Sequence, residues 1–142
     1  MTDDSRTGDD EAIVIAMFDA LSHGDLDGAI FHLADDGVID ASRSRGPVSG
    51  IVRGRTEVRS AWGQFLEAWD EVHWDLRLFK RLESGALIFE SRPRLRGRAS
   101  GLETSARGGW LVRVRDGKVT YGALFQSPED ALAHAAAEGE EA

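Results

Sequence analysis

The spacing of apolar residues changes near the middle of the chain, at about Asp70. Upstream of Asp70 the apolar residues recur at intervals of three and four, which is typical of helices with one buried face. Gly24 is expected to end the first helix, Asp25 to start the second, and Thr56 to cap the third. The pattern therefore predicts helices near residues 10–22, 26–34 and 56–69.

In the second half of the chain apolar and polar residues alternate, which is typical of strands with one buried face. The alternation predicts strands near residues 71–82, 86–98, 103–115 and 118–126. Asp116-Gly117 is expected to join the last two strands as a tight hairpin turn. Ser127 is expected to cap a last short helix, with Pro128 in its first position. Helices followed by an antiparallel sheet predict an α+β fold.

With 142 residues the chain has room for one domain of ordinary size. Its net charge of -8 is concentrated at the ends, because residues 1–11 carry five acids and one arginine and residues 129–142 carry five acids and no base. The ends together carry -9, so the rest of the chain has a net charge of only +1, and we expect no nucleic-acid partner. We expect an acidic flexible tail over residues 1–10, one domain over residues 11–136, and a second acidic flexible tail over residues 137–142.

The composition also argues against several kinds of site. No apolar run approaches the roughly 18 residues that span a bilayer, so we expect no membrane partner. The acidic N-terminal segment lacks the apolar block of a secretory signal, which favours the cytoplasm as the location. The chain has no cysteine, which excludes disulfides and thiolate chemistry. We expect no metal site and no cofactor, because the four histidines lack ligand spacing and no phosphate loop or dinucleotide fingerprint is present: His23, His32, His73 and His134.

Four short motifs occur in an order that resembles a known family. They are Gly24-Asp25-Leu26-Asp27, Leu33-Ala34-Asp35-Asp36, Ser49-Gly50 to Arg53-Gly54-Arg55, and Arg115-Asp116-Gly117-Lys118. Together they resemble the SnoaL-like branch of the nuclear transport factor 2-like superfamily, over about residues 11–136. The resemblance implies a cone-shaped, curved antiparallel sheet wrapped around the N-terminal helices, as in the cystatin-like α+β barrel. It also implies a mostly apolar pocket at the open end of the cone, and a homodimer.

The same superfamily includes ketosteroid isomerase and the polyketide cyclases. Ketosteroid isomerase uses a carboxylate base and an oxyanion hole made by a tyrosine and a neutral carboxylic acid. At the positions that match the base, the tyrosine and the acid, this sequence has Ala41, Met17 and Trp110. The resemblance therefore does not extend to steroid isomerisation by that mechanism.

Three polar residues remain as candidate catalytic groups: Asp40, Arg43 and Gln126. Asp40 neighbours Ala41 on the first predicted strand, so alternation turns it to the opposite face unless a bulge redirects it. Arg43 shares the parity of Ala41, and it is either an anion clamp at the pocket mouth or part of a solvated rim. Gln126 has inward parity on the last strand, where it either serves the site or bonds to backbone or water.

The resemblance and the inward parity together give a set of candidate ligand-binding residues: Met17, Ala41, Trp62, Trp74, Phe89, Trp110, Gly122 and Leu124. The three tryptophans either fill the core or form the walls of a pocket for a flat apolar or aromatic metabolite. Glycines at positions 101, 108, 109 and 122 either leave room beside those rings or mark bends of the sheet.

Four arginines alternate along one predicted strand: Arg92, Arg94, Arg96 and Arg98. We interpret them as an outer sheet face, either paired with Glu71, Asp75 and Glu103 on neighbouring strands or buried in a homodimer contact. Binding of an anion or a nucleic acid is the alternative.

Two classes of function are compatible with the sequence. The first is a small SnoaL-like enzyme, a cofactor-free cyclase, isomerase or hydrolase that acts on an apolar metabolite by acid/base chemistry. The second is a non-catalytic module for ligand binding or dimerisation. A pocket lined only by apolar and aromatic residues would favour the second class.

Overall fold

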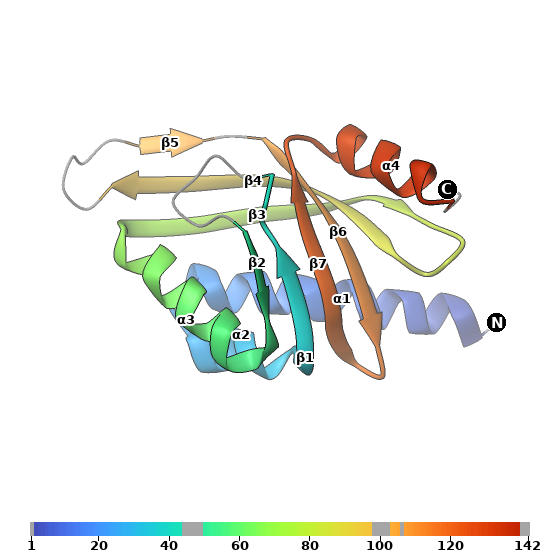
Figure 1. The fold of residues 1–142 in the computed structure, drawn as a ribbon, viewed down its shortest axis with the longest axis horizontal. Helices are drawn as coiled ribbons and strands as arrows, with labels where there is room; N and C mark the ends of the chain where they lie inside the picture. Colours follow the sequence, from blue (N-terminus) through green and yellow to red (C-terminus); the bar gives the residue numbers. More distant parts are fainter. Residues whose placement is uncertain (1, 44–49, 98–102, 106, 140–142) are drawn as a thin grey trace.

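The computed structural model describes residues 2–43, 50–97, 103–105 and 107–139. The helices are α1 (Thr2–Ser22), α2 (Leu26–Phe31), α3 (Gly54–Glu67) and α4 (Pro128–Ala137). The strands are β1 (Leu33–Asp40), β2 (Ile51–Arg53), β3 (Trp69–Arg81), β4 (Leu87–Gly97), β5 (Glu103–Ser105), β6 (Gly108–Arg115) and β7 (Lys118–Phe125). A curved sheet packs on α1, α2 and α3 on one side and on α4 on the other (Figure 1). The predicted α+β class is confirmed.

The sheet has the strand order β2-β1-β7-β6-β4-β3, with β5 paired to β4 off this path. Its strand pairs are antiparallel except for one, because β1 runs parallel to β7 with Ile39 opposite Gly122 and Asp40 opposite Ala123. The predicted curved antiparallel sheet is confirmed, and this parallel pair is its one exception among the described strands. β1 and β7 are distant in sequence, so no tight turn dictates their direction.

Three helix ends differ from the prediction. α1 begins at Thr2 and not near residue 10, since no proline interrupts it, and the helix therefore includes most of the segment that we predicted as a tail. α2 ends at Phe31, because Leu33 already belongs to β1. α3 begins at Gly54, and Arg53 occupies its N-cap position without a side-chain cap bond, so the predicted Thr56 cap is wrong.

Two other caps and one turn are confirmed. The Asp25 side chain accepts from the Gly28 N–H at 2.9 Å, and Ser127 Oγ accepts from the Asp130 N–H at 3.0 Å. Asp116 and Gly117 both have positive φ, 53° and 79°, as a two-residue hairpin turn of this kind requires.

The predicted strand over 103–115 is wrong as a single element. It is divided into β5 and β6, which pair with different parts of β4. The Arg94–Arg96 part of β4 pairs with β5, and the Leu87–Ser91 part pairs with β6. Residues 98–102, which include the glycine at position 101 named above, lie outside the described residues.

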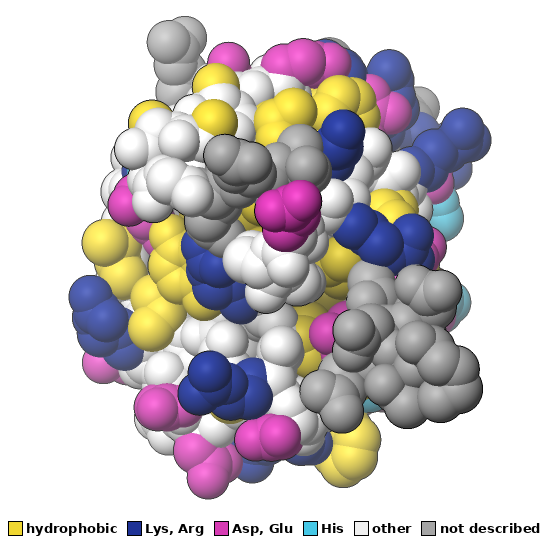
Figure 2. Space-filling view, turned by 90° about the vertical axis from the view of Figure 1, so that its right-hand side faces the viewer, with side chains coloured by type: hydrophobic (Ala, Val, Ile, Leu, Met, Phe, Trp, Pro, Cys, Tyr) yellow, Lys and Arg dark blue, Asp and Glu magenta, His cyan; other side chains and the backbone are white. Residues whose placement is uncertain are grey.

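The two faces of the sheet carry separate apolar clusters. The inner cluster lies against α1, α2 and α3 and contains Met17, Trp62, Phe89 and Trp110. The outer cluster lies under α4 and contains Ile88, Leu111, Ala123, Phe125, Ala131 and Ala135. Figure 2 shows acidic, basic and hydrophobic side chains interspersed on one face of the molecule, so neither charge dominates that face.

Candidate functional site

The predicted catalytic residue Asp40 ends β1 and is only 8% exposed. Its Oδ1 accepts from the Ser42 N–H at 2.9 Å and from Ser42 Oγ–H at 2.5 Å. Its Oδ2 lies 3.2 Å from Arg43 Nη1 in an ion pair. Ser42 and Arg43, in the segment just after β1, therefore satisfy both carboxylate oxygens.

These contacts determine the charge state of Asp40. Burial raises the pKa of the carboxyl, but the bonds from Ser42 and the adjacent Arg43 charge outweigh it and hold the pKa below its usual value. A general base works best with a pKa near the operating pH and a free oxygen directed at the substrate. In this structure Asp40 meets neither condition, and its catalytic role remains a prediction.

The structure brings the other two catalytic candidates to the same place. Gln126 Nε2 donates to the Arg43 carbonyl oxygen at 2.8 Å, and the Arg43 guanidinium lies over the Phe125 ring, 4.6 Å from its centroid. Phe125 belongs to the outer cluster, whereas Ile39, the neighbour of Asp40, belongs to the inner one. Arg43 and Gln126 lie beyond the ends of β1 and β7, so the alternation rule that we applied to them does not hold there.

The predicted ligand-binding residues are packed against one another. Met17, Trp62, Phe89 and Trp110 are members of the inner cluster, and Trp74 and Leu124 pack against it. Phe18 contacts the rings of Trp74 and Trp110, with centroids 5.7 and 5.2 Å apart. Ala41 is also buried, and its N–H donates to the Gly50 carbonyl oxygen at 2.7 Å. Their contact with a ligand remains a prediction.

Two glycines that we expected beside the tryptophan rings have defined neighbours. A Cβ at Gly122 would lie 3.3 Å from Ile39 Cδ1 and 3.7 Å from the Trp110 ring. The Trp110 ring therefore packs beside Gly122, as one of the two alternatives predicted. A Cβ at Gly109 would lie 2.3 Å from the Ser127 carbonyl oxygen. Gly109 therefore makes room for the backbone that leads into α4.

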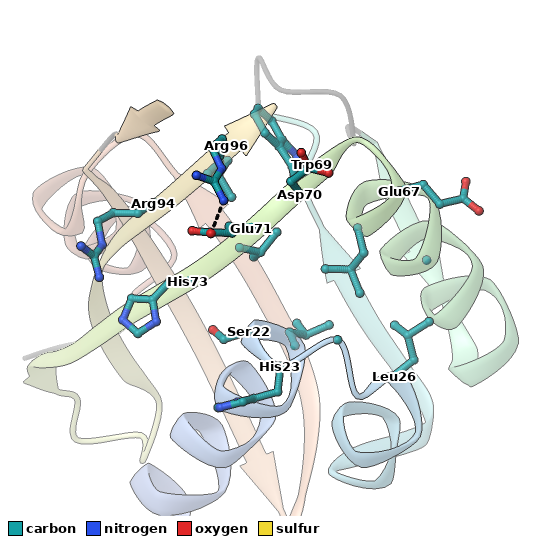
Figure 3. Close-up of a pocket in the computed structure, with 16 residues that line it drawn as sticks. Ser22, His23, Leu26, Glu67, Trp69, Asp70, Glu71, His73, Arg94 and Arg96 are labelled. Carbon is teal, nitrogen blue, oxygen red and sulfur yellow. Dashed lines mark hydrogen bonds and ion pairs between the residues drawn. The ribbon is translucent and has the colours of Figure 1, made fainter. Parts of the chain in front are cut away.

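An open cleft of about 730 Å³ lies elsewhere, between the turn after α1, the last turns of α3, and the paired strands β3 and β4 (Figure 3). Its apolar lining comes from Leu21, Leu26, Leu66, Trp69, Val72 and Leu95. Its polar lining includes Ser22, His23, Glu71, His73, Arg94 and Arg96. This volume is within the range of small-molecule sites.

Local sequence explains how the cleft is built. β3 is at the edge of the sheet, and Ser22 at the end of α1 accepts from the Trp74 N–H at 2.9 Å, which fixes the helix end to that edge. Gly24, with φ of 72°, then turns the chain into α2. Gly63 on α3 also lines the cleft, and a Cβ at this position would lie 3.6 Å from Leu26. Because glycine has no side chain, α3 leaves this part of the cleft open.

The strand register determines which charged side chains face each other across β3 and β4. Glu71 is opposite Arg96 and forms an ion pair with it, as we predicted for the arginine face. His73 is opposite Arg94, and neither side chain forms an ion pair or hydrogen bond within the part of the chain that the structure describes. The alternation marked Glu71 and His73 as outward residues, but sequence reasoning missed the cleft because α1 and α3 complete it.

The rest of the arginine face differs in detail from the prediction. Arg92 is 3.6 Å from Glu90 on its own strand, and Asp75 is 3.9 Å from Arg77. Arg98 and the side chain of Glu103 lie outside the described residues.

Neither a metal centre nor a membrane span is found among the described residues. No group of three or more histidine, aspartate or glutamate side chains there could hold a metal ion. No helix in the same part of the chain is both long and apolar enough to cross a membrane.

Solved structures share this fold at low sequence identity. SalBIII, an epoxide hydrolase/cyclase-like enzyme, is 15% identical, with a TM-score of 0.72 over 92% of this chain and 97% of its own. Delta 5-3-ketosteroid isomerase from Mycobacterium sp. is 18% identical, with a TM-score of 0.69 over 83% and 92%. TerC, co-crystallised with polyporic acid, is 11% identical, with a TM-score of 0.71 over 87% and 95%.

No curated protein matches the sequence. The family model of the SnoaL-like domain matches residues 14–122, most of the region that we predicted as the domain. The curved sheet, the order of the elements and this match agree with one another. The structural neighbours of this chain also include nuclear transport factor 2-like and ketosteroid isomerase-like proteins. The chain therefore belongs to the SnoaL-like domain family.

Proposed function

We propose that this protein binds a small organic molecule in the cleft between α1, α3 and the β3–β4 pair. The observation that carries the proposal is the cleft itself, about 730 Å³ in volume, with leucine side chains and Trp69 on one part of its wall and polar side chains on another. A wall of this kind removes the apolar body of a ligand from water and orients its polar end.

The environment of the candidate catalytic groups favours binding over catalysis. The three positions that match the isomerase base, tyrosine and acid are Ala41, Met17 and Trp110, and all three side chains are buried. A structural neighbour, TerC, was co-crystallised with polyporic acid, which supports an organic molecule as the ligand class here.

The test uses Gly63, which lines the cleft from the middle of α3. We expect Gly63→Leu to fold, because leucine favours helix and its Cβ would make an ordinary contact of 3.6 Å with Leu26. The rest of the new side chain occupies the cleft. Binding of the neutral fluorescent probe N-phenyl-1-naphthylamine should weaken by more than about tenfold.

The matched control is Gln64→Leu, which adds the same side chain at the next, exposed position of α3, outside the cleft lining. Probe affinity in this variant should equal that of the wild type. Equal affinity in all three proteins would show that the cleft is not the binding site.

A second candidate is an acid/base enzyme of the cyclase or isomerase kind, favoured by the convergence of Asp40, Arg43 and Gln126. Under this alternative Asp40→Asn would abolish turnover of an epoxide or polyketide substrate and leave probe binding in the cleft unchanged. A cytoplasmic location remains part of the proposal, and fractionation of cells that express a tagged chain would test it.

A further inference from the structure

The alternation along β3 and β4 divides the lining of the cleft between the two faces of the sheet. Trp74 packs against the inner cluster, so Val72, two residues before it, and Leu95, which is opposite Val72 on β4, also face the helices. His73 and Arg94 leave the opposite, exposed face. A ligand between the sheet and the helices therefore contacts Val72 and Leu95 and does not reach the Arg94 guanidinium.

The helices complete an apolar surface on this side of the sheet. Leu21 of α1 and Leu66 of α3 line the same cleft, and Leu21 is only 2% exposed. The acids Glu67 and Asp70 also line it, from the end of α3 and the start of β3. Acids disfavour an anion, and an apolar wall disfavours a charge of either sign, because an ion loses its water there without gaining a partner. This side of the cleft therefore fits a neutral, largely apolar body.

Ser22, the last residue of α1, adds one hydroxyl to this surface. Its Oγ accepts from the Trp74 N–H at 2.9 Å, which fixes the oxygen between the end of α1 and β3 (Figure 3). A serine hydroxyl also has one O–H to donate, and Ser22 donates to no acceptor within the described part of the chain. Because Ser22 lines the cleft and is partly buried, an oxygen of a bound ligand would complete its hydrogen bonding.

We propose that the cleft selects neutral, largely apolar molecules that carry one hydrogen-bond-accepting oxygen, such as an aryl ketone, and that Ser22 Oγ–H donates to that oxygen. The body of the ligand lies against four apolar side chains: Leu21, Leu66, Val72 and Leu95. This inference rests on the proposed function and deepens it by naming the ligand class and the residue that orients the ligand. Since the Trp74 N–H already holds Oγ in place, binding costs the hydroxyl little conformational freedom.

The experiment compares two fluorescent probes that differ at one group. 6-Propionyl-2-dimethylaminonaphthalene is a neutral ketone, and 6-propyl-2-dimethylaminonaphthalene has a methylene in place of the carbonyl. We expect Ser22→Ala to weaken binding of the ketone by about fivefold, the usual effect of one neutral hydrogen bond, and to leave binding of the propyl probe unchanged. Ser22→Thr keeps the hydroxyl and should retain both affinities. Near-ultraviolet circular dichroism verifies that each variant keeps the native packing.

Ser84→Ala is the matched control, because Ser84 Oγ also accepts from a backbone N–H, that of Ala86 at 3.3 Å, and Ser84 is not part of the cleft lining. It should leave both affinities unchanged. An equal loss for the two probes in Ser22→Ala would overturn the inference, since it would indicate a distorted cleft and no specific bond. Unchanged ketone affinity in Ser22→Ala would overturn it too.

A measurement on the wild type is independent of how the variants fold. The infrared carbonyl band of the bound ketone should lie at a lower frequency than in cyclohexane, because a hydrogen bond weakens the C=O bond. A band at the cyclohexane frequency would contradict the inference. The anionic analogue 6-dimethylamino-2-naphthoate should bind at least about tenfold more weakly than the ketone, and equal or tighter binding would rule out selection of neutral ligands.

The failure of this inference can be told apart from failure of the proposed function. If Gly63→Leu weakens both probes while Ser22→Ala does not distinguish them, the cleft binds small molecules but Ser22 does not select among them. If Gly63→Leu changes neither probe, the cleft is not the site and both proposals fall.

Discussion

At the residue scale, Gly109 shows how one absent side chain positions an element. A Cβ at this position would lie 2.3 Å from the Ser127 carbonyl oxygen and 2.4 Å from its carbon, and both are backbone atoms. Non-bonded Cβ contacts are essentially never this short, so any larger residue must displace the chain that leads into α4. Gly108, the preceding residue of β6, is less constrained, because its nearest contact would be 3.4 Å from the Phe125 carbonyl oxygen.

We predict that Gly109→Ala lowers the free energy of unfolding by about 2 kcal/mol, the usual cost of overpacking a filled site. Gly108→Ala should change it by less than about 0.5 kcal/mol. Urea unfolding of the two variants beside the wild type measures the difference. Equal losses would show that the contact with Ser127 does not limit this position.

Asp40 gives a pH-dependent prediction at the same scale. Its pKa in the folded protein is below the ordinary value, so its contribution to stability is complete above the unfolded pKa of about 3.9 and is lost as the pH falls through the lower folded value. Asp40→Asn should cost about 1 kcal/mol at pH 7 by weakening the contacts with Ser42 and Arg43.

The measurement is urea unfolding of wild type and Asp40→Asn across a series of pH values. The stability difference should shrink below pH about 4, since protonation removes the charge that the variant already lacks. A difference that is constant with pH would mean that the charge of Asp40 does not contribute.

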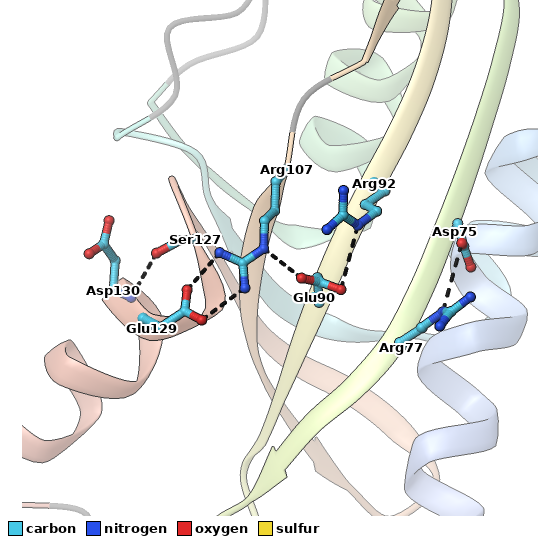
Figure 4. Close-up of polar contacts among 8 residues, drawn as sticks. All are labelled: Asp75, Arg77, Glu90, Arg92, Arg107, Ser127, Glu129 and Asp130. Atoms are coloured by element: carbon cyan, nitrogen blue, oxygen red, sulfur yellow. Dashed lines mark hydrogen bonds and ion pairs between the residues drawn. The ribbon is translucent and has the colours of Figure 1, made fainter.

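At the element scale, α4 is attached to the sheet by a small apolar face and by Arg107. Arg107 Nη1 and Nη2 donate to the two carboxylate oxygens of Glu129 at 2.7 and 2.8 Å, and its Nε donates to Glu90 Oε2 at 2.5 Å (Figure 4). The hydrogen bonds from Arg107 lower the pKa of Glu129 to about 2. The same guanidinium lowers the pKa of Glu90. Arg107 therefore links the first turn of α4 to β4.

We predict that Arg107→Gln selectively loosens α4. Hydrogen exchange of the α4 amides, corrected for intrinsic rates, should be faster at pH 7 in Arg107→Gln than in the wild type, while exchange of the β3 and β4 amides is unchanged. In the wild type this protection should decrease as the pH falls from about 4.3, the ordinary glutamate pKa, through the folded value. The variant should lack that decrease.

Arg92→Gln is the control for the loss of one positive charge beside Glu90, because Arg92 contacts Glu90 but not Glu129. If Arg92→Gln accelerated exchange of the α4 amides as much as Arg107→Gln does, the bonds between Arg107 and Glu129 would not be what attaches α4.

At the scale of the whole molecule, α4 limits which part of the sheet can meet another copy. It packs on β6, β4 and β7 and covers apolar residues of the outer face, including Leu111 and Ala123. The homodimer that we expected through the sheet remains a prediction, and its contact would use the uncovered β3–β4 region that carries Arg92. The same region carries Arg94 and Arg96, which are among the residues that line the cleft.

Light scattering on the purified chain should give a mass twice the 15.5 kDa of one copy, if this prediction is right. Arg92→Glu should then reduce the dimer fraction, because it reverses a charge at the expected contact. A monomer mass at high protein concentration would contradict the dimer and leave the cleft proposals intact.

The sequence alone determined those features that depend on neighbouring residues. Asp25 and Ser127 cap helices, and Asp116-Gly117 makes a hairpin, because each acts through groups within three residues of itself. The alternation along β3 likewise separated Trp74, which packs on the inner cluster, from the exposed His73. The order of the four short motifs was enough to identify the family.

Only the tertiary structure decided the features that depend on residues distant in the chain. The parallel pairing of β1 with β7, the contact of Gly109 with Ser127, and the placement of Arg43 over Phe125 join segments whose approach no local pattern encodes. The cleft is the clearest case, because Leu26, Gly63 and Arg94 become neighbours of one cavity only after α2, α3 and β4 have packed. Local bonding sets the elements, but a binding site requires long-range packing to bring their surfaces together.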